Sequence, residues 1–187
     1  MTRIIGGTAG GRRLKTPAGS RTRPTSDRVR EALFSSVDAA LGSLHGLRFL
    51  DLYAGSGAVG LEARSRGAAV VTLVEQDRRT AALIRENARA LGFTGVEVVA
   101  RSAHAFLVEP PSASYDVVFL DPPYDLPDGQ VSAALQALSG RSFLAAGALV
   151  VVERSGRGAE PTWPDGLAAG KARRYGETVL WYGRATA

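Results

Sequence analysis

The residues at positions 121–124, Asp-Pro-Pro-Tyr, combine a carboxylate, two prolines and an aromatic ring directly after an apolar run. Two consecutive prolines fix two φ angles and remove two amide donors, so they form a stiff loop whose carbonyl groups accept hydrogen bonds. Together with the Asp121 carboxylate, these acceptors can hold both hydrogens of an exocyclic amine, and Tyr124 can stack on the attached ring. We therefore expect Asp121, Pro122 and Tyr124 to be catalytic. The alternative is a rigid turn where a strand ends.

The chemistry of a nucleobase amine explains why such a loop would be needed. The amine is a poor nucleophile because its lone pair is delocalised into the ring. Acceptors for both N–H hydrogens localise that lone pair and stabilise the charge that develops as a methyl group arrives. In-line alignment of the amine nitrogen, the methyl group and the sulfonium that carries it supplies most of the remaining acceleration. Asp121 can also accept the proton during or after transfer, although water can take it as well.

A second cluster occupies positions 51–60, Asp-Leu-Tyr-Ala-Gly-Ser-Gly-Ala-Val-Gly, and contains G-x-G-x-x-G where a helix should begin. Glu75 follows twenty residues after Gly55, at the end of the next apolar run. Glycines let the backbone turn sharply and approach a ligand, and an acid at this place can accept hydrogen bonds from both ribose hydroxyls. The pattern indicates a nucleoside cofactor, with purely structural glycines as the alternative.

Asp51 helps to choose between NAD and S-adenosylmethionine, which both fit such a unit. It lies four residues before Gly55, where a carboxylate can hold the amino group or cation of a methionine moiety but sits awkwardly beside a pyrophosphate. A carboxylate satisfied by loop amides explains Asp51 equally well. We expect S-adenosylmethionine, bound by Asp51, Ala54, Gly55, Gly57, Glu75, Gln76, Ser102 and Ala103. No metal is expected, because the chain has no cysteine and only two isolated histidines.

The elements that would position these residues alternate along the chain. Apolar runs typical of strands buried on both faces occupy 47–52, 70–74, 96–99, 117–120 and 149–152. Helix-compatible segments lie near 26–42, 58–67, 78–91, 102–108 and 128–139. The alternation predicts an α/β, Rossmann-like fold with a mostly parallel sheet between helices, and residues 172–175 and 178–183 predict a C-terminal antiparallel hairpin at its edge.

Both motifs should face one crevice of this sheet. In an open α/β sheet, ligands bind beyond the carboxyl ends of the strands, at the point where the strand order reverses. The first and fourth strands would be neighbours at that point. The glycine cluster after the first strand and the Asp-Pro-Pro-Tyr loop after the fourth would then share one site.

Positive charge is concentrated near the N-terminus. Residues 1–30 contain eight basic side chains and one acid, whereas the whole chain carries a net charge of +5. Of its 23 basic residues only two are lysines, and arginine suits bidentate phosphate contacts and stacking on bases. A GC-rich genome would explain the preference for arginine but not the clustering. We expect a basic arm (residues 1–25) that binds nucleic acid and a catalytic domain over residues 26–187. The expected contacts with RNA are Arg12, Arg13, Arg23, Thr25, Arg28 and Arg30.

Further arginines lie in the C-terminal part of the chain. They either extend the basic surface or solvate loops and the hairpin: Arg154, Arg157, Arg173 and Arg174.

The motifs together resemble a known family. Asp-Pro-Pro-Tyr after the fourth strand and Asp-x-x-x-Gly-x-Gly after the first resemble class I S-adenosylmethionine-dependent methyltransferases that act on exocyclic nitrogens. Within that class, Arg-Ile-Ile-Gly-Gly at 3–7, Gly-Arg-Arg-Leu at 11–14 and Thr-Arg-Pro-Thr-Ser-Asp-Arg-Val-Arg-Glu-Ala-Leu-Phe at 22–34 resemble the RsmD family, bacterial 16S rRNA (guanine-N2)-methyltransferases, over nearly the whole chain.

This resemblance implies transfer of one methyl group to N2 of a guanine in 16S rRNA, within an assembled or nearly assembled 30S subunit. It implies that Asp121 and Tyr124 belong to the catalytic loop, that Gly55, Gly57 and Glu75 contact the cofactor, and that residues 23–30 face the rRNA. One departure concerns the adenine amine, for which many class I enzymes have an Asp after the third strand. This chain has Arg-Ser-Ala at 101–103, so either the Ser102 hydroxyl or water would accept that hydrogen bond.

Other functions stay open at this point: an amino-methyltransferase acting on another RNA or on adenine N6 of DNA, and a non-enzymatic ribosome-assembly factor that binds RNA. The 187 residues leave no room for an added DNA target-recognition domain. The composition, 45% hydrophobic and 22% charged, excludes disordered and coiled-coil chains. With no apolar run near the roughly 20 residues of a membrane span and no signal-peptide core, we expect a cytoplasmic monomer with no membrane partner.

Overall fold

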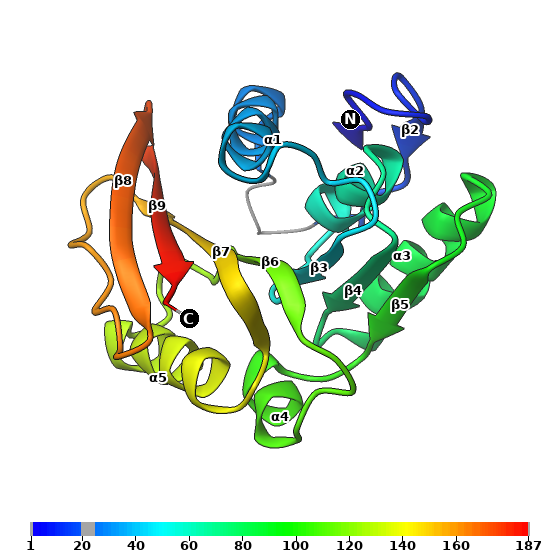
Figure 1. Ribbon diagram of the computed structural model, residues 1–187. Coiled ribbons are helices and arrows are strands. Elements are labelled where there is room, and N and C mark those ends of the chain that lie inside the picture. Colours follow the sequence, from blue (N-terminus) through cyan, green and yellow to red (C-terminus); the bar gives the residue numbers. More distant parts are fainter. Residues whose placement is uncertain (1, 20–24, 187) are drawn as a thin grey trace.

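The fold is built on one seven-stranded sheet, seen in a computed structural model that describes residues 2–19 and 25–186 (Figure 1). The strand order is β5-β4-β3-β6-β7-β9-β8. The parallel strands are β3 (Arg48–Asp51), β4 (Val70–Val74), β5 (Val96–Val99), β6 (Tyr115–Leu120) and β7 (Leu144–Ser155). The antiparallel hairpin consists of β8 (Leu167–Tyr175) and β9 (Thr178–Ala185). These strands confirm the expected α/β fold and the C-terminal hairpin, in which β9 lies between β7 and β8.

Helices cover both faces of the sheet, because each central strand buries side chains on both sides. The helices are α1 (Asp27–Leu41), α2 (Ala58–Ser65), α3 (Arg78–Ala90), α4 (Ala103–Val108) and α5 (Asp128–Gly140). Phe49 and Val117 pack with α1, α2 and α3 in one core, whereas the adjacent Leu50 and Val118 pack with α4 and α5 in the other (Figure 1). None of these helices, in the described part of the chain, is long and apolar enough to cross a membrane.

The register of the central strands brings the two motifs to the same edge. β3 pairs in parallel with β6, with Asp51 opposite Phe119. β6 pairs in parallel with β7, with Leu120 opposite Val152. The residues that follow these positions therefore leave the sheet together at its carboxyl edge.

The start of the basic arm packs against the body of the protein. β1 (Thr2–Arg3) and β2 (Arg13–Leu14) form a small antiparallel ladder, here called the N-terminal hairpin. Ile4, Ala9 and Leu14 lie in the core shared with α1, α2 and α3. The backbone N–H groups of residues 5 and 6 donate to the buried carboxylate of Glu62 on α2. This half of the arm is therefore part of the folded core, a role that its sparse apolar pattern did not predict.

Candidate active site

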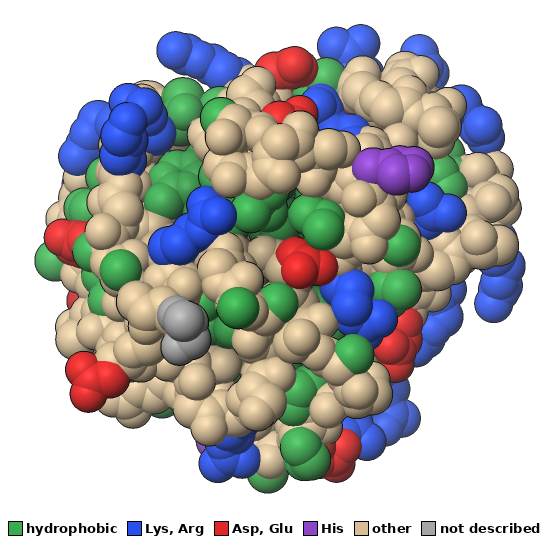
Figure 2. Space-filling model, viewed as in Figure 1, with side chains coloured by type: hydrophobic (Ala, Val, Ile, Leu, Met, Phe, Trp, Pro, Cys, Tyr) green, Lys and Arg blue, Asp and Glu red, His purple; other side chains and the backbone are tan. Residues whose placement is uncertain are grey.

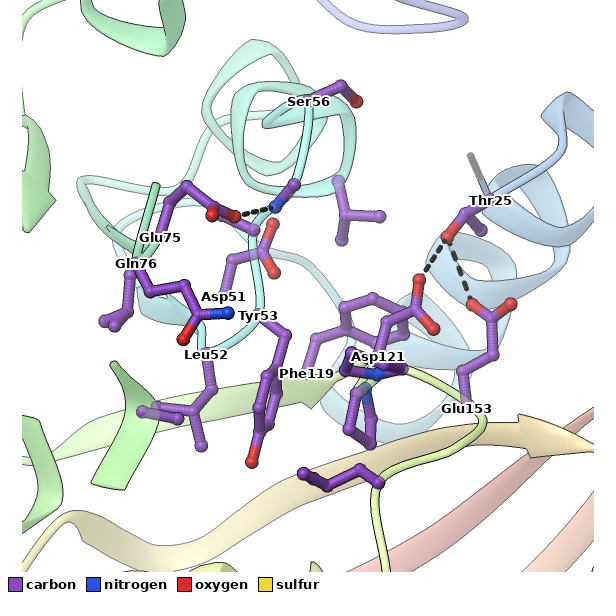
Figure 3. A pocket seen from close by; sticks show the side chains of 18 of the residues that line it. Thr25, Asp51, Leu52, Tyr53, Ser56, Glu75, Gln76, Phe119, Asp121 and Glu153 are labelled. Atoms are coloured by element: carbon purple, nitrogen blue, oxygen red, sulfur yellow. Dashed lines mark hydrogen bonds between the residues drawn. The ribbon is translucent and has the colours of Figure 1, made fainter. Parts of the chain in front are cut away.

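One large cleft opens at the carboxyl edge of the sheet and collects the residues that the two motifs supply (Figure 3). Its volume is about 2320 Å³, more than the roughly 300–1,000 Å³ of a pocket for one small ligand. Among the acidic residues that line it, four lie near the carboxyl ends of four different strands: Asp51, Glu75, Asp121 and Glu153. The prediction that both motifs face one crevice is confirmed.

The glycine loop (residues 54–57) needs its glycines for the backbone. Gly55 has φ 53° and Gly57 has φ 82°, left-handed values that residues with a Cβ atom rarely adopt. A Cβ atom on Gly57 would also lie 3.0 Å from the side chain of Ile84, whereas one on Gly55 would meet nothing within 4 Å. Gly57 is thus required by packing against α3, and Gly55 lies at the open side of the loop. Ala54 and Gly55 both line the cleft.

Asp51 is buried at the base of the cleft, with 1% of its surface exposed. Its Oδ2 accepts the backbone N–H of Gly60 at 3.0 Å, whereas its Oδ1 is buried without a hydrogen-bond partner. The pKa of Asp51 is raised to about 7, chiefly by burial and also by the negative charges of Glu75 and Glu153, while the hydrogen bond from Gly60 opposes the shift. The interpretation of Asp51 as a carboxylate satisfied by loop amides therefore accounts for one oxygen and leaves the other without a partner.

Glu75 lies beyond the end of β4 and holds the glycine loop. Its Oε2 accepts the N–H of Gly55 at 2.8 Å, and its Oε1 accepts the N–H of Asp77 at 2.9 Å. Each carboxylate oxygen has a further lone pair, so the same group can accept hydroxyl hydrogens of a ribose. Gln76 follows it and also lines the cleft (Figure 3).

Ser102 and Ala103 line the cleft at the start of α4. The Ser102 hydroxyl oxygen accepts the N–H of Ala105 at 3.1 Å and so caps this helix. Ser102, the candidate acceptor for an adenine amine, therefore also caps helix α4. The sequence pattern does not predict this structural role.

The Asp-Pro-Pro-Tyr loop (residues 121–124) follows β6 directly. Asp121 is partly buried and Pro122 buried, whereas Tyr124 is 42% exposed. The Tyr124 hydroxyl lies 3.2 Å from Oγ1 of Thr178 at the start of β9. The hairpin therefore helps to place the aromatic ring at the mouth of the cleft.

Asp121 is held beside a second carboxylate. Thr25 Oγ1 lies 3.1 Å from Asp121 Oδ2 and 3.1 Å from Glu153 Oε2 (Figure 3). Burial and the charge of Glu153 raise the pKa of Asp121 well above its usual range, and the Thr25 hydrogen bond opposes this shift. Thr25 is one of the expected RNA contacts, and its hydroxyl lies between the two carboxylates because the chain approaches the cleft just before α1.

Arg154 holds the segment that contains the Asp-Pro-Pro-Tyr loop through hydrogen bonds to its carbonyl groups. Because its side chain is buried, it does not extend the exposed basic surface. Its side chain is 9% exposed. Nη1 donates to the Pro123 carbonyl at 3.0 Å, and Nη2 donates to the Leu126 carbonyl at 3.1 Å. Nη2 also lies 3.4 Å from Oδ1 of Asp128. These bonds fix the path of the chain after residue 122.

The sequence does not indicate that Glu153 lies at this site, and it leaves Arg154 as either part of the basic surface or a residue that solvates a loop. The sequence feature that could have indicated both residues is the run Val-Val-Val-Glu-Arg at 150–154. In this run two charged residues follow directly after an apolar segment that is typical of a strand buried on both faces. Such charges need partners. The identity of those partners depends on the register between β6 and β7, which the run alone does not reveal.

The expected RNA contacts divide by exposure. Arg12, Arg13 and Arg28 are exposed. Figure 2 shows basic side chains along its upper edge, where Figure 1 places α1 and the N-terminal hairpin, and others down the right side and at the lower edge. Arg30 is only 1% exposed. Its Nη2 donates to the Arg3 carbonyl at 2.7 Å and to Asp27 Oδ1 at 2.8 Å, so the expectation that Arg30 contacts RNA is wrong. Arg23 lies outside the described residues.

Comparisons with known proteins identify the family. A family model described as "Conserved hypothetical protein 95" matches residues 2–184. The chain is 38% identical over 162 residues to the ribosomal RNA small subunit methyltransferase D of Escherichia coli K12, which covers 87% of this chain and 79% of that protein. The solved structure of the Escherichia coli protein yhhF superposes with a TM-score of 0.88 and 33% identity, covering 100% of this chain and 98% of that one.

A more distant structure shows the same fold with a cofactor in place. The magnesium protoporphyrin IX methyltransferase from Synechocystis, solved with bound S-adenosylmethionine, has a TM-score of 0.65 at 14% identity, over 85% of this chain and 79% of that one. The sheet and its helices thus form the class I methyltransferase fold. Because the family model spans residues 2–184 and the match to the Escherichia coli methyltransferase covers 87% of the chain at 38% identity, the chain belongs to the Conserved hypothetical protein 95 family, which is the RsmD family.

Proposed function

We propose that the protein transfers a methyl group from S-adenosylmethionine to the exocyclic N2 of a guanine in 16S rRNA. One observation carries the proposal: Asp51, whose Oδ1 has no hydrogen-bond partner, and the Asp-Pro-Pro-Tyr loop line the same cleft. A cation-binding carboxylate and a set of acceptors for a base amine are thus side by side. The name of the Escherichia coli relative, a small subunit rRNA methyltransferase, supports rRNA as the substrate.

The cleft fits S-adenosylmethionine through its acids. The buried Oδ1 of Asp51 lacks a partner, and an ammonium group would satisfy it. Glu75 shapes the glycine loop through Gly55 and keeps free lone pairs for ribose hydroxyls. When bound, S-adenosylmethionine supplies a methyl group activated by a sulfonium. The acids at the ends of β3 and β4 therefore bind and orient the cofactor.

The Asp-Pro-Pro-Tyr loop prepares the amine. Asp121 and the loop carbonyls accept both amine hydrogens. These hydrogen bonds localise the lone pair on the nitrogen, which makes the amine a better nucleophile. Tyr124 stacks on a base that has been extruded from its neighbours. The amine that gains the methyl group becomes cationic and must lose one proton. Asp121, whose pKa is raised by burial and by Glu153, accepts that proton.

The substrate would be held by the exposed arginines of the arm and α1. Arg12, Arg13 and Arg28 are exposed and would contact phosphates, and the flipped guanine would enter beside Tyr124, which is also exposed. We further propose that the substrate is the assembled or nearly assembled 30S subunit and that the protein acts on it as a monomer with no metal.

The test is the transfer of labelled methyl to unmodified 30S subunits, protein-free 16S rRNA and duplex DNA in parallel. Asp121→Ala is the loss variant, and Asp165→Ala, at an exposed aspartate in the loop before β8, is the matched control. We expect label in subunits, recovered as N2-methylguanine, absent with Asp121→Ala and present with Asp165→Ala.

Each other outcome points to a different function. Label in DNA alone, or in an adenine, would retain the catalytic argument and overturn the substrate. RNA binding without label in any arm, unchanged by Asp121→Ala, would favour a non-enzymatic assembly factor. Label found as N2-methylguanine in protein-free rRNA but not in subunits would overturn only the assembled substrate.

A further inference from the structure

The Thr25 hydroxyl bridges two carboxylates that come from neighbouring strands. Asp121 follows β6, Glu153 lies near the end of β7, and both are 3.1 Å from Thr25 Oγ1 (Figure 3). Parallel pairing of Leu120 with Val152 places the two acids side by side. A hydroxyl carries one hydrogen and accepts through its oxygen. Thr25 therefore donates to one carboxylate at a time, and the two acids share its hydrogen.

The position of this hydroxyl is fixed by the start of α1. Ser26 caps the helix by accepting the N–H of Val29 at 3.2 Å, and the Ser26 carbonyl accepts the N–H of Arg30 at 2.9 Å. Val29 is 5% exposed and packs in the core. The Thr25 backbone is thus attached to a packed helix turn, which holds its side chain beside Asp121.

We propose that Thr25 and Glu153 are positioning residues for Asp121, with the Thr25 hydroxyl, held between the two carboxylates, fixing the orientation of the Asp121 carboxylate. This inference rests on the proposed methyl transfer. Because Oδ2 of Asp121 is bound to Thr25, the second oxygen is the one presented to the base amine. The carboxylate cannot rotate about its last bond without breaking this contact.

The two neighbours act on the proton of Asp121 in opposite directions. The negative charge of Glu153 makes ionised Asp121 less stable, whereas a hydrogen bond from Thr25 makes it more stable. Asp51 adds negative charge from β3, and Arg154 adds positive charge from β7. Asp121 must be ionised to accept the amine hydrogens and must then hold a proton. A balance between the two neighbours keeps it able to do both.

The variants that separate these effects are nearly isosteric. Thr25→Val removes the hydroxyl and keeps the shape, and Thr25→Ser restores the hydroxyl. Glu153→Gln removes the charge and keeps a hydrogen-bonding group. Glu97→Gln on β5 and Thr162→Val in the loop before β8, both at exposed positions, are the matched controls. Thermal unfolding of each variant checks that it folds.

The first readout needs neither cofactor nor RNA. Carboxyl ¹³C resonances are followed against pH in the free protein, and the Asp121 signal is assigned by its loss in Asp121→Asn. We expect Glu153→Gln to lower the pKa of Asp121 and Thr25→Val to raise it, each by about 0.5 units or more. Thr25→Ser and both controls should leave it unchanged. Shifts in the same direction, or none, would overturn the proposal.

The second readout is the pH profile of methyl transfer to RNA. The acidic limb of kcat should move to lower pH in Glu153→Gln and to higher pH in Thr25→Val, with kcat of Thr25→Val reduced about 10-fold or more. The KM for RNA should stay within about twofold, because neither residue binds it. Wild-type protein that methylates no guanine would refute the proposed function; wild-type activity with a normal Thr25→Val profile would refute this inference alone.

Discussion

Glu75 and Gly55 are joined by a hydrogen bond of 2.8 Å, from the Gly55 N–H to Oε2 of the carboxylate. The other oxygen of Glu75 accepts the N–H of Asp77 at 2.9 Å. One side chain after β4 therefore fixes both the glycine loop and the segment that leads into α3. The shape of the loop and the binding of a ribose depend on the same carboxylate.

Replacement of Glu75 should weaken cofactor binding. Glu75→Ala removes an acceptor for ribose hydroxyls and releases the Gly55 N–H. Because a hydrogen bond to a charged group contributes about 1.5–3 kcal/mol, the Kd for S-adenosylmethionine should rise about 10- to 150-fold. Calorimetry measures this, with Glu97→Ala as the control at an exposed acid. An unchanged Kd would return Glu75 to a purely structural role.

Cofactor binding should also weaken as the pH falls through the pKa of Asp51. Burial raises that pKa to about 7, and only the ionised carboxylate can hold an ammonium group through Oδ1. The affinity should therefore fall between about pH 8 and about pH 6 in the wild type. In Asp51→Asn the affinity should be low throughout and should vary only with the ligand's own titration. Equal pH dependence in the wild type and in Asp51→Asn would contradict the role of Asp51 as the group that holds the ammonium of the cofactor.

The strands and the shared cleft could be predicted because burial on both faces leaves a continuous apolar run. The runs at 70–74 and 96–99 coincide with β4 and β5, and the parallel pairing of the first and fourth predicted strands is seen between β3 and β6. An ordered alternation of strands and helices has few possible topologies. The place of Asp51 and Asp121 at one edge follows from that topology.

The surroundings of Asp121 could not be predicted in the same way. They depend on which residue of β7 lies beside Leu120, and on where the chain before α1 approaches the sheet. Both are long-range relationships with no periodic signal. Arg30 shows the same limit, since the basic pattern marks it as exposed while Asp27 and the Arg3 carbonyl hold it inside the protein.

Two arginines on the first turn of α1 should respond differently to removal. Arg28 is exposed, whereas Arg30 is buried. Arg28→Ala should weaken RNA binding and reduce the slope of log K against log salt by about 1, without changing the melting temperature. Arg30→Ala should lower the free energy of unfolding by about 1–3 kcal/mol, because it leaves the Arg3 carbonyl without its partner. Filter binding across salt concentrations and urea unfolding measure the two effects.

The comparison is informative because the two variants remove the same charge two residues apart. An equal loss of salt dependence in both would mean that net charge, rather than a contact by Arg28, governs RNA binding. A stable Arg30→Ala variant would contradict a structural role for the buried guanidinium.

Glu62 should control the attachment of the N-terminal hairpin to the body. Its carboxylate is fully buried, and it accepts the N–H of Ile5 at 2.8 Å and that of Gly6 at 3.0 Å. Glu62→Gln places an amide NH₂ where one of these donors needs an acceptor, so the free energy of unfolding should fall by about 1–3 kcal/mol. Amide exchange at Ile5 and Gly6 should accelerate more than exchange in β6, because the hairpin opens before the central sheet does. Equal acceleration at both places would contradict local detachment and would instead make the hairpin part of the same cooperative unit as the sheet.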